Sequence, residues 1–157
     1  MTPPAAEAIY ARHQRDIYRY VLRMSGRPDV ADDVCQDVFL RIVRALQNGG
    51  AVGHERGWVF AIARNLMADR NRTALRRAAV EDTSAEPAAD ASQALAYGLD
   101  EALRRLADAD RDAFLLKEIG GLSYIEIAAV CSCTVESVRA RLFRTRMQLR
   151  AALQGLR

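Results

Sequence analysis

The 157-residue sequence has no long hydrophobic run and few residues of the kinds that ligate metals or form disulfides. It contains two histidines, three cysteines and one tryptophan, and only 6% of its residues are aromatic. No apolar stretch approaches the roughly 20 residues that a membrane-spanning helix needs, and the first residues lack the apolar core of a signal peptide. We therefore expect a cytoplasmic protein without membrane insertion, in which the cysteines are reduced thiols rather than a disulfide framework.

Residues of common catalytic sites are also scarce. The chain has no glycine-rich loop of the kind that cradles phosphate, and neither His13 nor His54 has a recognisable partner for nucleophilic catalysis. Cys131 and Cys133 lie one residue apart, which raises the alternative of a metal- or thiol-responsive repressor. Both histidines lie far from this pair, however, and a Cys-x-Cys pair alone is an incomplete zinc site. The sequence thus predicts no enzyme and no bound cofactor or metal.

The abundant residues favour helices. Hydrophobic residues make up 50% of the chain, alanine, leucine and arginine dominate, and β-branched runs are scarce, which predicts an all-α fold. Helical periodicity predicts three long helices at residues 3–26, 27–50 and 58–77, with a flexible loop at 48–57. The expected inward residues are Ile9, Ile17, Tyr20, Val21 and Met24 in the first helix, Val30, Val34, Val38 and Ile42 in the second, flanked by Phe39 and Leu46, and Trp58, Ile62, Leu66 and Met67 in the third.

An acidic segment divides the chain. Residues 81–92 are small or acidic and include Pro87, a composition that is typical of a linker rather than of a core. Four further helices are predicted after it, with breaks near Ala107, at Gly120-Gly121 and across the two cysteines. We therefore expect two small helical domains, at residues 1–80 and 93–157, joined by a flexible acidic linker at 81–92.

The strongest local pattern lies around the cysteine turn. Ser123 can cap a short helix, and Glu126 three residues later completes a capping box. Thr134 or Ser132 can cap the next helix, which would turn its apolar side inward. That side consists of Val135, Val138, Leu142 and Leu149. Two helices joined by a turn of three or four residues predict a helix-turn-helix, whose second helix enters the major groove of DNA.

The charge of that second helix supports DNA as the partner. The net charge is only +3, but every charged residue from Arg139 to the C-terminus is an arginine. The guanidinium fork matches a guanine edge or a phosphate, so a basic helix fits a polyanion. On charge alone, a solvated arginine face explains the pattern equally well. The residues placed to reach bases are Glu136, Ser137, Arg139, Ala140 and Phe143, with Arg144 and Arg146 placed for phosphates.

Three segments together resemble one protein family. EIGGLSYIEIAAVCSCTVESVRARLFRTRMQLR, at residues 118–150, resembles region four of the extracytoplasmic-function (ECF) sigma factors of bacteria, which belong to the sigma-70 family. ADDVCQDVFLRIVRAL, at 31–46, and RGWVFAIARNLMADRNR, at 56–72, resemble two segments of region two. The three motifs stand in the family's order and cover nearly the whole chain. The resemblance implies a dissociable promoter-specificity subunit of RNA polymerase, not an enzyme.

The resemblance also implies roles for individual residues and for partners. It implies contact with the clamp of the largest subunit of core RNA polymerase, contact with promoter DNA, and control by an anti-sigma factor. The positions that match core-polymerase binding are Asp33, Gln36, Asp37 and Arg41. Those that match the minus-ten element are Arg64, Asn65, Asp69, Arg70, Arg72 and Asn48. Asn48 lies with His54 in the loop Gln47–Glu55, which matches the loop that would hold a flipped base. Those that match the minus-thirty-five element are Glu136, Ser137, Arg139, Ala140, Phe143 and Arg144.

Some residues depart from the family pattern and bear on which promoters are read. Ser132 stands where glycine is common, Ala107 where proline is common, and Ala140 where serine is frequent. Glu136 replaces a small residue, and although it would repel phosphate, it could accept a hydrogen bond from a cytosine amino group.

Other interpretations stay open beside these roles. The linker is either the family's channel-threading segment or a solvated spacer. Trp58 is expected in the core rather than stacked on a base, and Cys131 and Cys133 are expected as compact, buried residues in the core of the turn. A helical protein that only binds partners would leave the basic helix unexplained.

Overall fold

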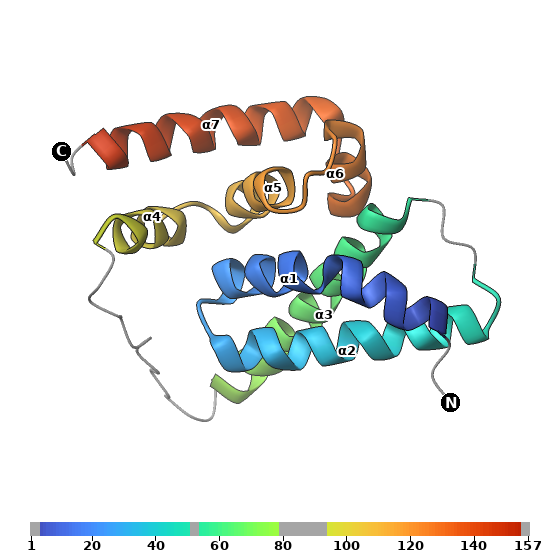
Figure 1. Cartoon of the computed structure of the whole chain (residues 1–157). Coiled ribbons are helices and arrows are strands. Elements are labelled where there is room, and N and C mark those ends of the chain that lie inside the picture. The colour runs from blue at the N-terminus through green and yellow to red at the C-terminus, as the bar shows by residue number, and fades with distance from the viewer. Residues whose placement is uncertain (1–3, 51–53, 79–93, 155–157) are drawn as a thin grey trace. The chain divides into compact units, whose positions relative to one another are not determined.

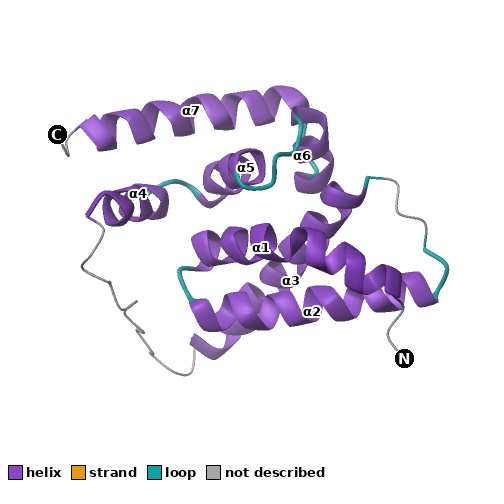
Figure 2. Ribbon diagram, in the orientation of Figure 1, coloured by secondary structure: helices purple, strands orange, loops and turns teal. Residues whose placement is uncertain are grey.

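The computed structural model describes residues 4–50, 54–78 and 94–154 (Figure 1). Every regular element in these ranges is a helix, in the order α1 to α7, and Figure 2 shows no strand among the described residues. The predicted all-α fold is therefore confirmed. The chain divides into two compact units, Met1–Pro87 and Ala88–Arg157. The predicted acidic linker at 81–92 lies outside the described residues. None of the described helices combines the length and apolar character that crossing a membrane requires.

The first unit contains three helices that pack on one another, with α1 (Pro4–Ser25) and α2 (Pro28–Gln47) antiparallel and α3 (Glu55–Ala78) against both. Gly26 has a φ of 70°, a left-handed conformation that glycine adopts without steric cost and that ends α1. Pro28 occupies the first turn of α2, where its missing N–H is not needed. Helix α3 begins at Glu55, so the predicted loop 48–57 is shorter than expected at its C-terminal end.

The core of the first unit corrects part of the sequence prediction. Tyr20 of α1 and Phe60 of α3 are fully buried and meet edge to face, with ring centroids 5.5 Å apart. The residues that were expected in this core but are only partly buried are Met24, Val30, Phe39, Leu46, Trp58 and Ile62. The residues of α3 that lie in the core are Val59, Phe60, Ala63, Leu66 and Met67. Positions four apart on a helix are offset by about 40°, so the series 58, 62, 66 rotates away from a single packing face.

The second unit contains α4 (Ala94–Arg104), α5 (Asp108–Glu118), α6 (Tyr124–Cys131) and α7 (Val135–Gln154), which are the four helices that the sequence predicts. Helix α7 packs on all three of the others. Its inward side follows helical spacing, and the core residues it contributes are Val138, Leu142, Thr145 and Leu149. The turn after α5 needs glycine, because a Cβ on Gly120 would lie 2.5 Å from the carbonyl oxygen of Leu116.

Candidate nucleic-acid interface

A capping box starts the helix that precedes the cysteine turn. The backbone N–H of Glu126 donates to the hydroxyl of Ser123 at 3.1 Å, and the N–H of Ser123 donates to the Glu126 carboxylate at 3.0 Å. These two bonds satisfy donors that the first turn of a helix otherwise leaves unpaired. Ile127 and Ala128 are buried one turn later. The predicted capping box and the inward side of α6 are therefore confirmed.

A tight turn joins α6 to α7. Ser132 has a φ of 54° and a ψ of 48°, the left-handed conformation that a helix commonly uses to end. The N–H of Cys133 then donates to the carbonyl of Ala128 at 3.0 Å. Of the two predicted caps for α7, Thr134 fills the role, because its hydroxyl accepts from the N–H of Ser137 at 3.0 Å. Two helices and this short turn form a helix-turn-helix.

The two cysteines of the turn are free thiols and only partly buried. The thiol of Cys131 lies 3.9 Å from a carboxylate oxygen of Asp112, which accepts its weak hydrogen bond. Within the described residues, no group of three or more histidine, cysteine and acidic side chains is placed to hold a metal ion. Cys131 and Cys133 therefore form the rim of the turn's core rather than its centre, which corrects the expectation of burial.

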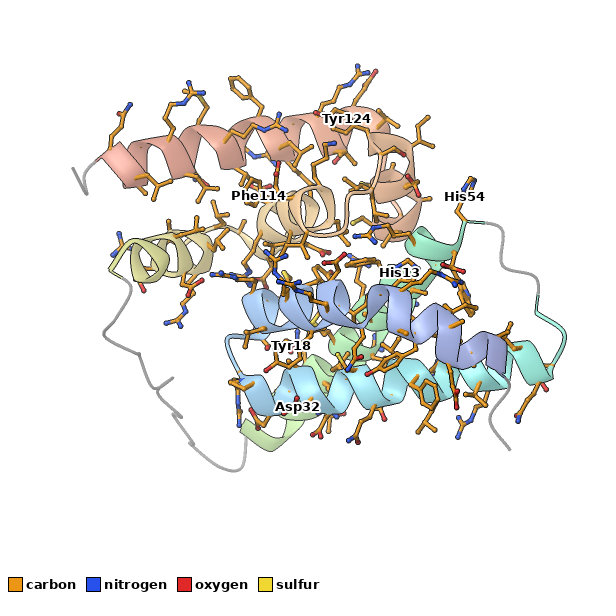
Figure 3. All side chains as sticks on the ribbon, in the orientation of Figure 1. His13, Tyr18, Asp32, His54, Phe114 and Tyr124 are labelled. Carbon is orange, nitrogen blue, oxygen red and sulfur yellow. The ribbon has the colours of Figure 1, made fainter. Side chains whose placement is uncertain are left out.

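The outer side of α7 exposes most of the residues predicted to read DNA. Figure 3 shows side chains that extend from α7 on the side away from α5. Phe143 is 66% exposed and Met147 is 51% exposed. The other exposed members of the predicted set are Glu136, Arg139, Ala140 and Arg144, and Ser137 is partly exposed. The sequence reading missed Met147, although it follows Phe143 by four residues and so lies on the same side of the helix.

One predicted DNA-binding arginine is already paired within the protein. The guanidinium of Arg144 donates to both carboxylate oxygens of Asp110, through Nη2 at 3.0 Å and Nε at 3.4 Å. These bonds raise the pKa of Arg144, so it stays charged at any physiological pH. Arg139 and Arg146, by contrast, make no ion pair with any other described residue of the chain. The sequence reading did not find Asp110, which lies 34 positions before Arg144.

In the first unit, the face predicted to bind core polymerase lies on α2. Asp33, Gln36 and Arg41 are exposed, and Asp37 is partly exposed. Leu40 lies among them and is 52% exposed. The sequence reading assigned no role to Leu40. An apolar side chain inside a polar rim is the arrangement typical of a protein–protein contact.

The face predicted to bind the minus-ten element lies on α3. Asn65, Asp69 and Arg72 are exposed, and Arg72 pairs with Asp69. Arg70 and Arg64 are partly exposed. The guanidinium of Arg70 lies 3.5 Å from the carboxylate of Asp33 and 3.7 Å from that of Asp37, both on α2. Asn48 and His54 are exposed at the two ends of the loop whose residues 51–53 lie outside the described ranges.

A polar cluster joins the start of α3 to α1, and sequence reasoning missed it. Glu55, the first residue of α3, accepts hydrogen bonds from Arg12 at 2.6 and 3.0 Å and bonds the ring of the buried His13 at 2.7 Å. These bonds hold the pKa of Glu55 near 2, well below its usual range. The next residue, Arg56, pairs with Asp16 at 2.6 Å. The cluster anchors the point at which the candidate base-binding loop becomes helix.

The sequence matches two family models, one in each unit. The family described as Sigma-70 region 2 matches residues 9–79, and that described as Sigma-70, region 4 matches residues 98–149. The ECF RNA polymerase sigma factor SigE of Mycolicibacterium smegmatis is 35% identical over 94% of this chain, and the match spans 61% of that longer relative. SigC of Mycobacterium tuberculosis, also an ECF sigma factor, is 35% identical over 94% of this chain and 82% of its own length.

Two solved structures are similar to the described fold. One is the sigma factor RpoE from Bartonella quintana in complex with the anti-sigma factor NepR, with 25% identity, a TM-score of 0.76, and coverage of 92% of this chain and 93% of that one. The other is CnrH in complex with the cytosolic domain of CnrY, with 25% identity, a TM-score of 0.68, and coverage of 96% and 88%. Two matched regions in order, and a relative 35% identical along most of its length, show that the chain belongs to the ECF RNA polymerase sigma factors.

Proposed function

We propose that this protein binds core RNA polymerase and directs transcription initiation at specific promoters, without catalysing a reaction itself. The observation that carries the proposal is the helix-turn-helix of the second unit. Its second helix exposes Arg139, Phe143 and Arg144 on a side that no other described helix of the unit covers. An arginine-bearing helix of this kind fits the major groove, and the first unit supplies a separate exposed face for polymerase.

The second unit, at 93–157, would read the minus-thirty-five element as duplex DNA. Arginine can donate two hydrogen bonds to the O6 and N7 atoms of guanine, and apolar side chains can contact the methyl group of thymine. The exposed Phe143 and Met147 suit the second role. Glu136 would accept from a cytosine amino group. The residues proposed to contact this element are Glu136, Ser137, Arg139, Ala140, Phe143, Arg144 and Met147.

The first unit, at 1–80, would bind polymerase through α2 and the minus-ten element through α3. Asp33, Gln36, Asp37 and Arg41 would form the polar rim of the polymerase contact, with Leu40 at its centre. Separating the strands requires cations for the phosphates and a site for an unstacked base. The residues proposed for that role are Arg64, Asn65, Asp69, Arg70, Arg72 and Asn48.

Two small binding sites joined by a linker at 81–92 make polymerase essential to the proposed function. Each site alone would bind DNA weakly, because avidity arises only when both sites are held at the spacing of the promoter elements. We also propose a cytoplasmic location and control by an anti-sigma factor. That control is supported by the sigma factors of similar fold that were solved with anti-sigma partners.

Run-off transcription with core polymerase tests the proposed function. Purified chain is added to core enzyme over a library of promoter fragments from the source genome, and new transcripts are sequenced. We expect initiation from a small set of fragments that share two elements at a constant spacing. Core enzyme alone and core enzyme with an unrelated sigma factor serve as controls. The absence of any added initiation would contradict the proposal. A pull-down from the native host that recovers only polymerase subunits would contradict the anti-sigma part alone.

A further inference from the structure

We infer, on the basis of the proposed function, that Asp110 of α5 is a positioning residue for promoter recognition. It holds the guanidinium of Arg144 in one orientation on the DNA-facing side of α7, and so it sharpens the choice of base pairs in the minus-thirty-five element. Asp110 itself touches no DNA in this arrangement, because its side chain is only 8% exposed.

The geometry of the pair leaves Arg144 able to bind a second partner. The carboxylate of Asp110 accepts hydrogen bonds from the Nε–H and from one N–H of Nη2. A guanidinium has five N–H donors, so three remain, including both on Nη1. The Arg144 side chain is 56% exposed, which leaves these donors accessible from solvent. The Asp110 carboxylate thus binds the inner edge of the guanidinium and leaves the outer edge free.

The backbone of Asp110 also binds a side chain of α7. Its carbonyl oxygen accepts a hydrogen bond from the hydroxyl of Thr145 at 3.3 Å, and Thr145 is fully buried. Two consecutive residues of α7 are therefore held by one residue of α5. Asp110 therefore contacts both Arg144 and the neighbouring core residue Thr145, but only its carboxylate orients the arginine.

A held arginine contributes to specificity differently from a free one. An unpaired arginine loses rotamer freedom when it binds a base, whereas Arg144 has already lost much of that freedom in the folded protein. The neighbouring negative charge also weakens its general attraction to phosphate. Asp110 should therefore lower non-specific binding while it favours the one geometry that suits a base edge. Arg146, which is placed for phosphates, lacks such a partner among the described residues, and this suits a sequence-independent contact.

The test compares base preference in the holoenzyme. Core polymerase is loaded with wild-type chain, D110N, R144A or the double variant, and each holoenzyme transcribes a promoter pool with a randomised minus-thirty-five element. D110N should lower the preference at one or two base pairs by at least about fivefold, since a good bidentate contact discriminates by that much or more. R144A should lose the preference at the same base pairs, and the double variant should lose no more than R144A does.

Two control variants separate positioning from a loss of fold. D108N makes the same charge change in the first turn of α5, where Asp108 is 91% exposed and pairs with Arg111. T145V removes the hydroxyl bond to Asp110 but keeps the pair with Arg144. Both should leave the base preference unchanged, even if T145V lowers the melting temperature. An unchanged preference in D110N, or losses at different base pairs in D110N and R144A, would overturn the inference while the proposed function stands. If wild-type holoenzyme selects no promoter, both fail.

A measurement on the wild-type chain keeps the inference testable if D110N does not fold. Nitrogen-15 relaxation of the arginine Nε–H groups reports side-chain motion on the picosecond-to-nanosecond timescale. The Nε–H of Arg144 should be markedly more ordered than those of Arg139 and Arg146. Equal mobility of the three would overturn the inference without any substitution.

Discussion

The guanidinium of Arg70 lies 3.5 Å from the carboxylate of Asp33, so a residue proposed to bind DNA contacts a residue proposed to bind polymerase. Arg70 also lies 3.7 Å from Asp37. A carboxylate that turns toward polymerase would release the arginine for a phosphate. Because all three side chains are more than a third exposed, water and salt screen these pairs, and the coupling is small.

We predict that D33N raises the affinity of the free chain for single-stranded minus-ten DNA by about twofold, in line with the 0–1 kcal/mol of an exposed pair. The reason is that Arg70 loses a competing partner. Fluorescence anisotropy at low salt measures the affinity. D32N is the matched control, because Asp32 is the adjacent exposed acid on α2 and has no pair with Arg70. In an R70A background the gain from D33N should vanish, and an equal gain there would mean that only net charge matters.

The second prediction concerns the effect of low pH on the polar cluster at the start of α3. The pKa of Glu55 is lowered to about 2 by its bonds with Arg12 and His13, so these bonds stabilise the folded state. This stability is fully present above the usual pKa of a glutamate, near 4.5, and is lost as pH falls toward 2. E55Q should therefore melt a few degrees lower than wild type at pH 7, with the difference shrinking below about pH 5.

Thermal unfolding followed by circular dichroism between pH 7 and pH 3 measures this difference. E7Q is a suitable control, because Glu7 is exposed on α1 and makes no ion pair with another described residue. Its melting temperature relative to wild type should not vary with pH in the same way. A constant offset between E55Q and wild type across this pH range would contradict the prediction.

The third prediction ranks the cysteines by reactivity. Burial raises the pKa of Cys35 to about 11, and its side chain lies in the core of the first unit. Almost none of it is thiolate at pH 7.5, and the thiolate is the reactive form. Iodoacetamide under native conditions should therefore modify Cys131 and Cys133, which are partly exposed, well before Cys35. Mass spectrometry of peptides over time gives the order, and faster modification of Cys35 would contradict the structure.

The local features of this fold could be predicted from sequence, because their causes lie within a few residues. Pro28 starts α2, and Ser123 and Glu126 form a capping box. Both features could be predicted because each depends only on neighbours along the chain. The outer side of α7 was predicted for the same reason. Trp58 was assigned to the core wrongly, because the period of apolar residues does not say which neighbouring helix will cover which side.

The contacts that join distant segments could not be predicted. Asp110 and Arg144 are 34 positions apart, and Arg12 and Glu55 are 43 apart. No local pattern marks these charged residues as partners, because each pairing depends on how two helices pack. The sequence therefore identified which residues face solvent on the candidate site, but not which residues hold them in place.

The last prediction contrasts two serines of the helix-turn-helix. S132G should raise stability by about 0.5–1 kcal/mol, because Ser132 has a φ of 54°, and glycine adopts this conformation without a clash between Cβ and the following carbonyl. S123G makes the same chemical change but removes a hydroxyl that caps α6, and it should lower stability by roughly a few tenths of a kcal/mol.

Urea unfolding of the full chain, followed by circular dichroism, measures both changes, and run-off transcription checks function. Ser132 ends α6, its side chain is exposed, and it is not among the residues proposed to contact bases. S132G should therefore keep the same promoter preference as wild type. A loss of stability in S132G would mean that the serine side chain makes a contact worth more than the backbone strain. A change in promoter preference would instead mean that the turn conformation itself sets the angle at which α7 meets DNA.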